Sequence, residues 1–417
     1  MTSPKTDAEP TARSLSRILR GIAYSDRASG LLMMACAALG LLLMNIPLTA
    51  APLHHFSEIS VGIPWTNIVL PISEWAQDGL LTVFFLVVGL DLKQELTTGS
   101  LANPRKAAVP MLAAVGGMIA PPLVFLAVTG IFHANGAVPD FSVIERGWAV
   151  PTATDIAFSL AVLALFARGL PGAIRAFLMT LATVDDLLGI LLIAVLFSSF
   201  GQWYWFVGLV ACAVAWYFLC RLRKVPWVLV GALGLLTWVM MFEAGIHPTL
   251  SGVLVGLLTP SREMHGEATP RAERYHDRLV PVSALIALPI FAFFATGISL
   301  HGMSVAVLAS PLVLGLVLAL VVGKPLGIMA VSWAAVHFGR LKLADGLRVR
   351  DLIGLACACG IGFTVSFLIA SLAFNGSIFT GEARLAVLLG SLISAAIAGI
   401  VFSWQSRVFA SRRNLQQ

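Results

Sequence analysis

The chain has 417 residues, of which 58% are hydrophobic and only 12% are charged. Because soluble domains carry about 25% charged residues, this composition excludes a soluble domain and indicates a polytopic membrane protein. The formal net charge of +6 is compatible with a nucleic-acid partner, but the placement of the basic residues, described below, excludes one.

Residues 1–27 are predicted to form a cytoplasmic N-terminal segment. They are polar and basic and lack the early apolar stretch of a cleavable signal peptide. Leu15, Ile18, Leu19 and Ile22 recur at helical spacing opposite three arginines, which predicts a short helix on the membrane surface. An unstructured terminus before Leu15 is the alternative.

The rest of the chain is predicted to be all-α, with about twelve transmembrane helices. Windows of about 19 residues, broken at proline, glycine and charge, define these spans. They cover about residues 28–47, 72–92, 107–131, 148–167, 172–199, 203–220, 226–243, 247–260, 280–300, 309–338, 352–374 and 383–405. We therefore expect a single transmembrane domain, residues 28–405, and a cytoplasmic tail, residues 406–417.

The basic residues support this arrangement. With the N-terminus inside, 24 of the 27 lysines and arginines fall in segments on the inner side. Only Arg146 and Arg384 fall outside, and Lys324 lies within a span. This asymmetry is the positive-inside rule, so we expect both termini in the cytoplasm and no nucleic-acid partner.

Two connections are long. The outer one, residues 47–71, has partly alternating apolar residues, which allow a small β-hairpin that pairs with a second copy of the chain. A plain loop is the alternative. The longest inner loop, residues 261–278, is densely charged and contains His265 and His276.

Asp185 and Asp186 are adjacent carboxylates in the middle of the apolar run 171–200, where Arg175 is the only other charge. A charge at bilayer depth costs about 2.5–3.5 kcal/mol on insertion scales, so an intramembrane carboxylate indicates a functional site. Neighbouring helical residues point about 100° apart. The two carboxylates are therefore expected to have different partners.

Two spans are interrupted. Pro151 and Thr152 precede Thr154 and Asp155 in the fourth span, where proline removes a backbone donor and Thr or Asp favours a new helix start. An ordinary proline kink is the alternative. The eleventh span is weakened at Gly360-Ile361-Gly362, before Thr364, although small residues also serve helix packing.

The interrupted spans occupy corresponding positions. Each is the middle helix of a three-helix group, spans 3–5 and 10–12, and the groups are offset by seven helices, which inverts one relative to the other. This arrangement predicts two inverted repeats, about residues 107–199 and 309–405, whose broken helices 4 and 11 cross at mid-membrane. Interrupted segments in inverted halves indicate a transporter site.

Lys324 lies between Gly323 and Pro325, about 14 residues from either end of the run 311–338. Lysines near helix ends can extend to the interface, but about 20 Å of helix is too far for a side chain to cover. We therefore expect Lys324 to pair with a carboxylate or with a helix C-terminus in the membrane.

The sequence resembles the NhaA-type sodium/proton antiporter family over about residues 15–405. The motifs that carry the resemblance are Val87-Val88-Gly89-Leu90-Asp91-Leu92-Lys93-Gln94-Glu95-Leu96, Pro151-Thr152-Ala153-Thr154-Asp155-Ile156-Ala157-Phe158, Val184-Asp185-Asp186-Leu187, Gly245-Ile246-His247-Pro248-Thr249-Leu250, Gly323-Lys324-Pro325-Leu326-Gly327-Ile328 and Gly360-Ile361-Gly362-Phe363-Thr364.

The resemblance implies roles for single residues. Asp186 would be the principal sodium and proton carboxylate, with Thr154 near the ion, and Asp155 would balance the half-helix N-termini at the crossing. Asp185 would pair with Lys324. Four further residues match positions tied to pH response, and these are Asp78, Asp91, Glu95 and His247.

The chain departs from the family pattern at three places. Gln94 stands where the family often has a basic residue, and residues 273–277 keep charge and histidine in a different order. Ala295-Thr296 replaces a motif that often carries an asparagine. These departures concern the pH profile rather than the transport core.

The resulting functional expectation is a secondary active transporter, not an enzyme. It would export Na⁺, and also Li⁺, in electrogenic, pH-regulated exchange for protons by alternating access, with Asp186 and Asp155 binding the transported ion and with no cofactor. We expect a bacterial inner-membrane location, contact with membrane lipids, and a homodimer formed through residues 47–71.

The alternative function is a sodium-coupled solute symporter on a similar fold. An intramembrane aspartyl protease fits poorly, because its two carboxylates come from separate helices and share a proton.

Overall fold

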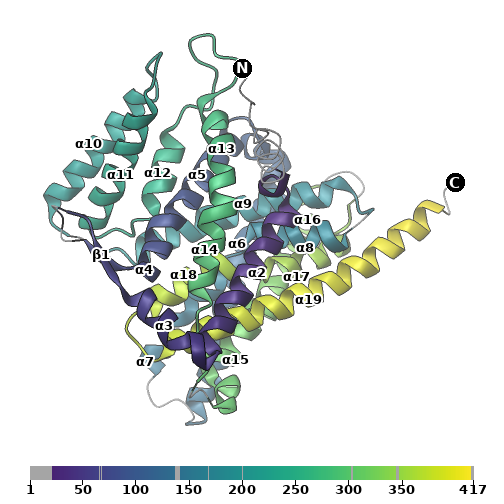
Figure 1. The fold of residues 1–417 in the computed structure, drawn as a ribbon. Helices are drawn as coiled ribbons and strands as arrows, with labels where there is room; N and C mark the ends of the chain where they lie inside the picture. Colours follow the sequence, from purple (N-terminus) through teal and green to yellow (C-terminus); the bar gives the residue numbers. More distant parts are fainter. Residues whose placement is uncertain are drawn as a thin grey trace, which may run out of the picture.

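The computed structural model describes residues 21–414 except 65, 67, 137–140, 168, 200, 302–303 and 344–346. Leu15, Ile18 and Leu19 of the expected surface helix lie outside the described residues. Figure 1 shows a bundle built almost entirely of helices. The connections after α10 and α12 lie at one end of that view, and α3 and α7 lie at the other.

The long helices follow the predicted spans closely. In chain order the helices are α2 (Asp26–Asn45), α3 (Pro47–Glu58), α4 (Ile72–Glu74), α5 (Leu81–Thr97), α6 (Pro104–Ala134), α7 (Phe141–Ile144), α8 (Ile156–Phe166), α9 (Gly172–Leu196), α10 (Trp203–Leu219), α11 (Trp227–Glu243), α12 (Leu250–Leu258), α13 (Arg271–Val282), α14 (Leu288–Ala295), α15 (Pro311–Leu318), α16 (Lys324–His337), α17 (Ile353–Cys359), α18 (Phe363–Ala373) and α19 (Phe379–Asn414).

Within the described ranges, seven helical segments are long and apolar enough to cross a membrane, or up to nine if each of two bent pairs is one span. Helices α10 and α11 are shorter and also apolar. The all-α, polytopic membrane fold is therefore confirmed. The total of twelve spans stays a prediction.

The outer connection is more structured than a plain loop. Its second half forms a hairpin in which β1 (Ser60–Gly62) pairs antiparallel with β2 (Val69–Pro71), with Val61 opposite Leu70. Its first half is helix α3, which the sequence analysis missed because it took Pro47 as the end of a span. Proline is well tolerated in the first helical turn, and Pro47 begins α3.

The inner loop is shorter than predicted, because α13 begins at Arg271 within the stretch assigned to it. Arg271 is buried and donates a hydrogen bond to the Cys220 carbonyl (2.9 Å), which ties α13 to the end of α10. A continuous helical segment, residues 271–295, therefore covers the predicted ninth span and its charged approach.

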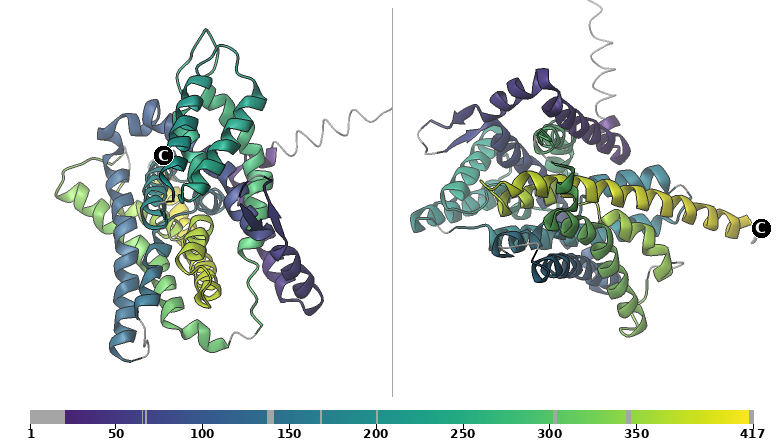
Figure 2. Two further views of the ribbon diagram at one scale, coloured as in Figure 1. Left: turned by 90° about the vertical axis from the view of Figure 1, so that its left-hand side faces the viewer. Right: turned by 90° about the horizontal axis from the view of Figure 1, so that it is seen from below.

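Both predicted interruptions are present. Residues 141–152 and 156–166 form one bent pair with an angle of 52°, and residues 349–359 and 363–373 form the other with an angle of 50°. Helix α19 packs against α8, α15, α17 and α18, and Figure 2 shows it passing across the middle of the molecule. The broken pairs are thus held between long, unbroken helices.

The tenth span changes pitch just before Lys324. Residues Ala319–Gly323 form a π-helical turn, and the Lys324 N–H donates to the Ala319 carbonyl five residues back. Pro325 has no N–H to donate, so it cannot continue the regular ladder. Such single π turns are frequent at functional sites, and this one aims Lys324 at the crossing.

Candidate functional site

The two broken helices cross through direct hydrogen bonds. The Asp155 N–H donates to the Ile361 carbonyl (2.7 Å), and the Thr154 hydroxyl donates to the Cys359 carbonyl (2.9 Å). The Ser159 hydroxyl donates to the Ala358 carbonyl (2.8 Å). The last carbonyls of α17 therefore find their partners on the other broken helix.

Asp155 caps two helices with one carboxylate. Its Oδ1 accepts from the Phe158 N–H of its own helix α8 (3.0 Å), and its Oδ2 accepts from the Thr364 N–H of α18 (3.1 Å). The side chain is only 3% exposed. Because helix N-termini carry unpaired N–H groups and partial positive charge, this carboxylate neutralises both half-helix ends at once.

Lys324 supplies the opposite charge. Its side chain is fully buried, its Nζ lies 2.8 Å from Asp185 Oδ2, and it also donates to the Thr152 carbonyl. Thr152 ends the first half of the broken fourth span. The ammonium group therefore balances both a carboxylate and the negative end of a half-helix.

Asp186 stands apart from this pairing. It is 6% exposed, and its Oδ1 accepts no hydrogen bond from the described residues. It nevertheless lies within electrostatic range of Asp185, Asp155 and Lys324. Asp185 and Asp186 thus face different partners, as their helical spacing predicts.

The remaining backbone positions of the predicted site are buried at the crossing. Pro151 and Thr152 close the first half-helix, Gly360 and Gly362 flank the break between α17 and α18, and Thr364 offers its N–H to Asp155. A Cβ at Gly360 would lie 2.5 Å from the Leu320 carbonyl oxygen. Only glycine allows this close approach between α17 and the tenth span.

The four residues expected in pH response do not form one cluster. Asp78 and His247 lie together, with His247 Nε2 3.6 Å from Asp78 Oδ1. Asp91 lies further along the same span and pairs with His276 of α13 (2.9 Å). These two pairs lie one on each side of the middle of the span 72–102.

Glu95 belongs to the second of these regions. Its Oε2 accepts from the N–H and the hydroxyl of Ser100, at 2.7 Å each. The Ser100 hydroxyl also contacts the Thr180 hydroxyl (2.9 Å) on α9, the helix that carries Asp185 and Asp186. Glu95 is therefore linked to the helix of the central carboxylates by one intervening serine.

Several contributing residues were not singled out from the sequence. Ser159 and Ser391 form hydrogen bonds to the backbone at the break between α17 and α18. Both are serines in apolar helices, a feature too common to indicate a site. His276 was noted only as part of a charged loop. Its partner Asp91 lies about 185 residues away, so no local pattern indicated the pair.

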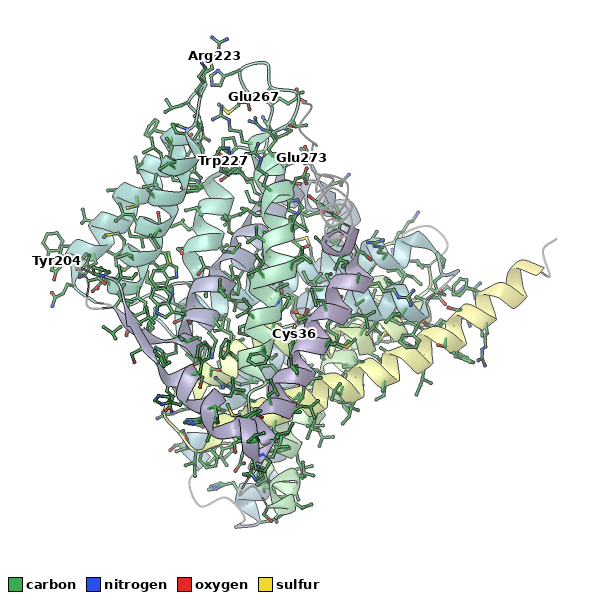
Figure 3. The ribbon with its side chains drawn as sticks, in the orientation of Figure 1. Cys36, Tyr204, Arg223, Trp227, Glu267 and Glu273 are labelled. Atoms are coloured by element: carbon green, nitrogen blue, oxygen red, sulfur yellow. The ribbon has the colours of Figure 1, made fainter. Side chains whose placement is uncertain are left out.

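A charged cluster outside the predicted site lies where α10, α11 and α13 meet, near Arg223, Trp227 and Glu267 in Figure 3. Glu267 contacts Arg271 (2.9 Å) and Arg274 (2.5 Å). The pKa of the Glu267 carboxyl is lowered mainly by the hydrogen bond from Arg271; burial opposes this shift, and the hydrogen bond from Arg274 adds to it. This cluster fixes the entry of the chain into α13.

The sequence was compared with known protein families. The family model described as "Na+/H+ antiporter 1" matches residues 20–402. The chain belongs to this family. The match includes both broken helices, α9 and the span of Lys324, so every residue of the predicted site lies inside it.

Curated relatives give the same result. A "Na(+)/H(+) antiporter NhaA" from Bifidobacterium longum is 63% identical over 410 residues, which cover 95% of this chain and 87% of the relative. A protein of the same name from Bifidobacterium breve is also 63% identical, over 95% of this chain and 89% of its own length. A protein of the same name from Frankia casuarinae is 41% identical, over 98% of this chain and 90% of its own length.

In this antiporter-family chain, Asp155→Ala should destabilise the fold as well as alter the site. It removes acceptors from two helix N-termini, and each lost cap costs about 0.5–2 kcal/mol. Thermal unfolding of the purified protein in detergent measures the loss, which should be smaller for Asp155→Asn because one acceptor oxygen remains. Ser25→Ala, which removes the cap of the peripheral end of α2, is the matched control. Unchanged stability of Asp155→Ala would contradict the double cap.

The ion pair of Asp185 with Lys324 should show strong coupling. Asp185→Asn or Lys324→Met alone leaves the remaining charge buried without its counter-charge, which should cost about 3–5 kcal/mol of unfolding free energy. The double variant removes both charges and should be more stable than either single variant. A double-mutant cycle of thermal stability measures the coupling. Additive losses would show that the two side chains do not depend on each other.

Proposed function

We propose that the chain exchanges sodium ions for protons across the membrane, with the crossing of the two broken helices as its ion site. The chain is a sodium/proton antiporter by family, and thus a transporter rather than an enzyme. The observation that carries the placement of the site is the buried Asp186 carboxylate, which has an unpaired oxygen beside the Asp155 cap and the Asp185–Lys324 pair.

The proposed ion ligands are oxygens. Sodium is a hard cation, and the crossing offers the Asp186 and Asp155 carboxylates, the Thr154 hydroxyl and backbone carbonyls freed by the broken helices. Asp155 already accepts two N–H bonds and Asp185 is paired with Lys324, so Asp186 is the carboxylate of the crossing with neither kind of partner among the described residues. We assign Asp186 as the principal sodium carboxylate and Asp155 and Thr154 as its supporting ligands.

Competition couples the two ions. A carboxylate away from water is stabilised by a bound cation or by a proton, because an unpaired charge there is costly. The site therefore holds either sodium or protons, and a conformational change that exposes it alternately to each side moves whichever is bound. Asp186, Asp155 and the Asp185–Lys324 pair interact closely, so they titrate as a set.

The same set supports electrogenic exchange. If two protons leave the carboxylates as one sodium ion binds, each cycle moves one net charge. The ion pair of Lys324 with Asp185 provides a further place where a proton can be taken up or released. We propose that lithium, a smaller hard cation, uses the same oxygens.

We also propose that activity is regulated by pH. The Asp91–His276 pair joins α5 to α13, and the His247–Asp78 pair joins the other part of that span to the segment before α12. Histidine changes charge between pH 5 and 8. Protonation of His276 would strengthen its contact with Asp91, and Glu95 would relay a shift of α5 through Ser100 to α9.

Sodium-driven proton movement in proteoliposomes tests the function and the site together. Asp186→Asn should abolish the pH change that an imposed sodium gradient produces between pH 6 and 9. Asp351→Asn is the matched control, since Asp351 is a buried carboxylate that caps a different helical turn. Exchange that persists in Asp186→Asn would refute the assignment of the sodium carboxylate.

The same vesicles resolve the finer proposals. With equal sodium and proton concentrations on both sides, an inside-negative potential should drive sodium out if more than one proton enters per sodium ion. No movement would show electroneutral exchange. Lithium in place of sodium should give the same pH change, and His276→Gln should flatten the dependence on pH.

We further propose a location in the bacterial inner membrane, with both termini cytoplasmic, surrounding lipids as neighbours, and a homodimer formed through residues 47–71. Leu48, Val61 and Val69 in this segment are 84%, 47% and 61% exposed. The hairpin also has free strand edges, which favour pairing with another chain. Exposed apolar residues on such an edge are typical of an interface.

Cross-linking tests the dimer. Val61→Cys should yield a covalent dimer when membranes containing the protein are oxidised, because the same strand of two copies would meet at the interface. Val305→Cys, which is 83% exposed outside the hairpin, is the control and should stay monomeric. A monomer of Val61→Cys, together with a monomeric mass in native conditions, would overturn the proposal.

A further inference from the structure

The break between α17 and α18 has polar neighbours other than Asp155. Helix α19 packs against both α17 and α18, and three serine hydroxyls lie near the break. They belong to Ser366 of α18 and to Ser391 and Ser394 of α19, and all three side chains are buried. Their positions are not explained by the ion ligands proposed above.

The glycines of the break make room for these hydroxyls. A Cβ at Gly360 would lie 2.6 Å from the Ser394 hydroxyl, and a Cβ at Gly362 would collide with the Ser366 hydroxyl. The hydroxyls therefore occupy the space that the missing side chains leave. The hydroxyls of Ser366 and Ser394 have no hydrogen-bond partner among the described residues, although each lies beside backbone of the break.

Ser391 has a defined contact with the half-helix. Its hydroxyl oxygen accepts a hydrogen bond from the Gly362 N–H (3.3 Å), the residue that precedes α18. The first N–H groups of any helix lack partners within the helix. At this end Asp155 binds the Thr364 N–H and Ser391 binds the Gly362 N–H, from opposite neighbours, α8 and α19.

We propose that Ser391 is a positioning residue for the transport site. It fixes the amino end of α18 from the side of α19, and with it the Thr364 N–H that binds Asp155, so that this carboxylate is held in place beside the ion site. The Ser366 and Ser394 hydroxyls lie beside Gly362 and Gly360 of the same break. This inference rests on the proposed ion site at Asp155 and Asp186.

The effect expected of losing Ser391 follows from the Gly362 N–H group that it binds. Without the Ser391 hydroxyl, the Gly362 N–H loses the acceptor that it has in this structure, and the first turn of α18 is held less firmly. The Thr364 N–H of that turn binds Asp155, so the carboxylate beside the ion is then less well positioned. Losing Ser391 should therefore weaken sodium binding more than it slows the transport cycle.

Transport kinetics of Ser391→Ala in proteoliposomes test the proposal. The apparent KM for sodium should rise about two- to tenfold, the range expected for one hydrogen bond, while the maximal rate stays within about twofold of the parent protein. Ser391→Thr keeps the hydroxyl and should restore the KM. Ser403→Ala is the matched control, because the Ser403 hydroxyl on the same helix bonds only to the Gly399 carbonyl of α19 itself.

A lower maximal rate with an unchanged KM would show a structural role only and would overturn the proposal, as would wild-type kinetics of Ser391→Ala. If Ser391→Ala does not fold, Ser391→Cys, whose sulfur is a weak acceptor, replaces it and should give an intermediate KM. Asp186→Asn and Asp155→Asn distinguish a failure of the proposed ion site from a failure of the role of Ser391. If these variants lose exchange while Ser391→Ala is unaffected, the ion site stands and only the role of Ser391 falls.

Discussion

The structure depends on satisfying the backbone of two helices that break inside a membrane. A bilayer offers no water to unpaired N–H and C=O groups, so irregular backbone persists there only when protein groups bind it. Here each broken helix supplies hydrogen-bond partners to the backbone of the other. Thr154 and Ser159 bind carbonyls at the end of α17, and the Asp155 carboxylate binds N–H groups at the start of α8 and of α18. Removing one partner leaves groups exposed on both helices.

Charge balance follows from the same geometry. The crossing collects positive and negative half-helix ends, and Asp155 and Lys324 each neutralise one kind. Lys324 also pairs with Asp185 at 2.8 Å, which offsets the cost of two buried charges. Asp186, the next residue, is then left without a counter-charge of its own. The proposed cation site rests on this carboxylate, which lies beside a cluster whose charges are otherwise balanced.

Contacts of α5 and α19 surround the helix crossing and link it to other parts of the protein. The span of α5 carries the Asp78–His247 contact and the Asp91–His276 contact at separate levels, and Glu95 reaches α9 through Ser100. Helix α19 spans the molecule and closes the second break with Ser391. Movement of α5 or α19 would therefore alter the surroundings of the carboxylates without touching them directly. The hairpin packs through Ile68 and Leu70 against Trp238, whose indole N–H donates to the Asp78 carbonyl.

The sequence by itself determined the membrane fold, the positions of the spans, both interruptions and the four buried charges, because hydropathy and the cost of intramembrane charge are local properties. It also predicted that Asp185 and Asp186 diverge, from helical spacing alone. It missed α3 and the start of α13, where proline and charge were taken as breaks although tertiary contacts sustain a helix. Only the tertiary structure decided which N–H groups Asp155 binds and that His276 meets Asp91. It alone revealed that Ser391 binds the Gly362 N–H at the start of α18, because these contacts join residues far apart in the chain and leave no periodic signal.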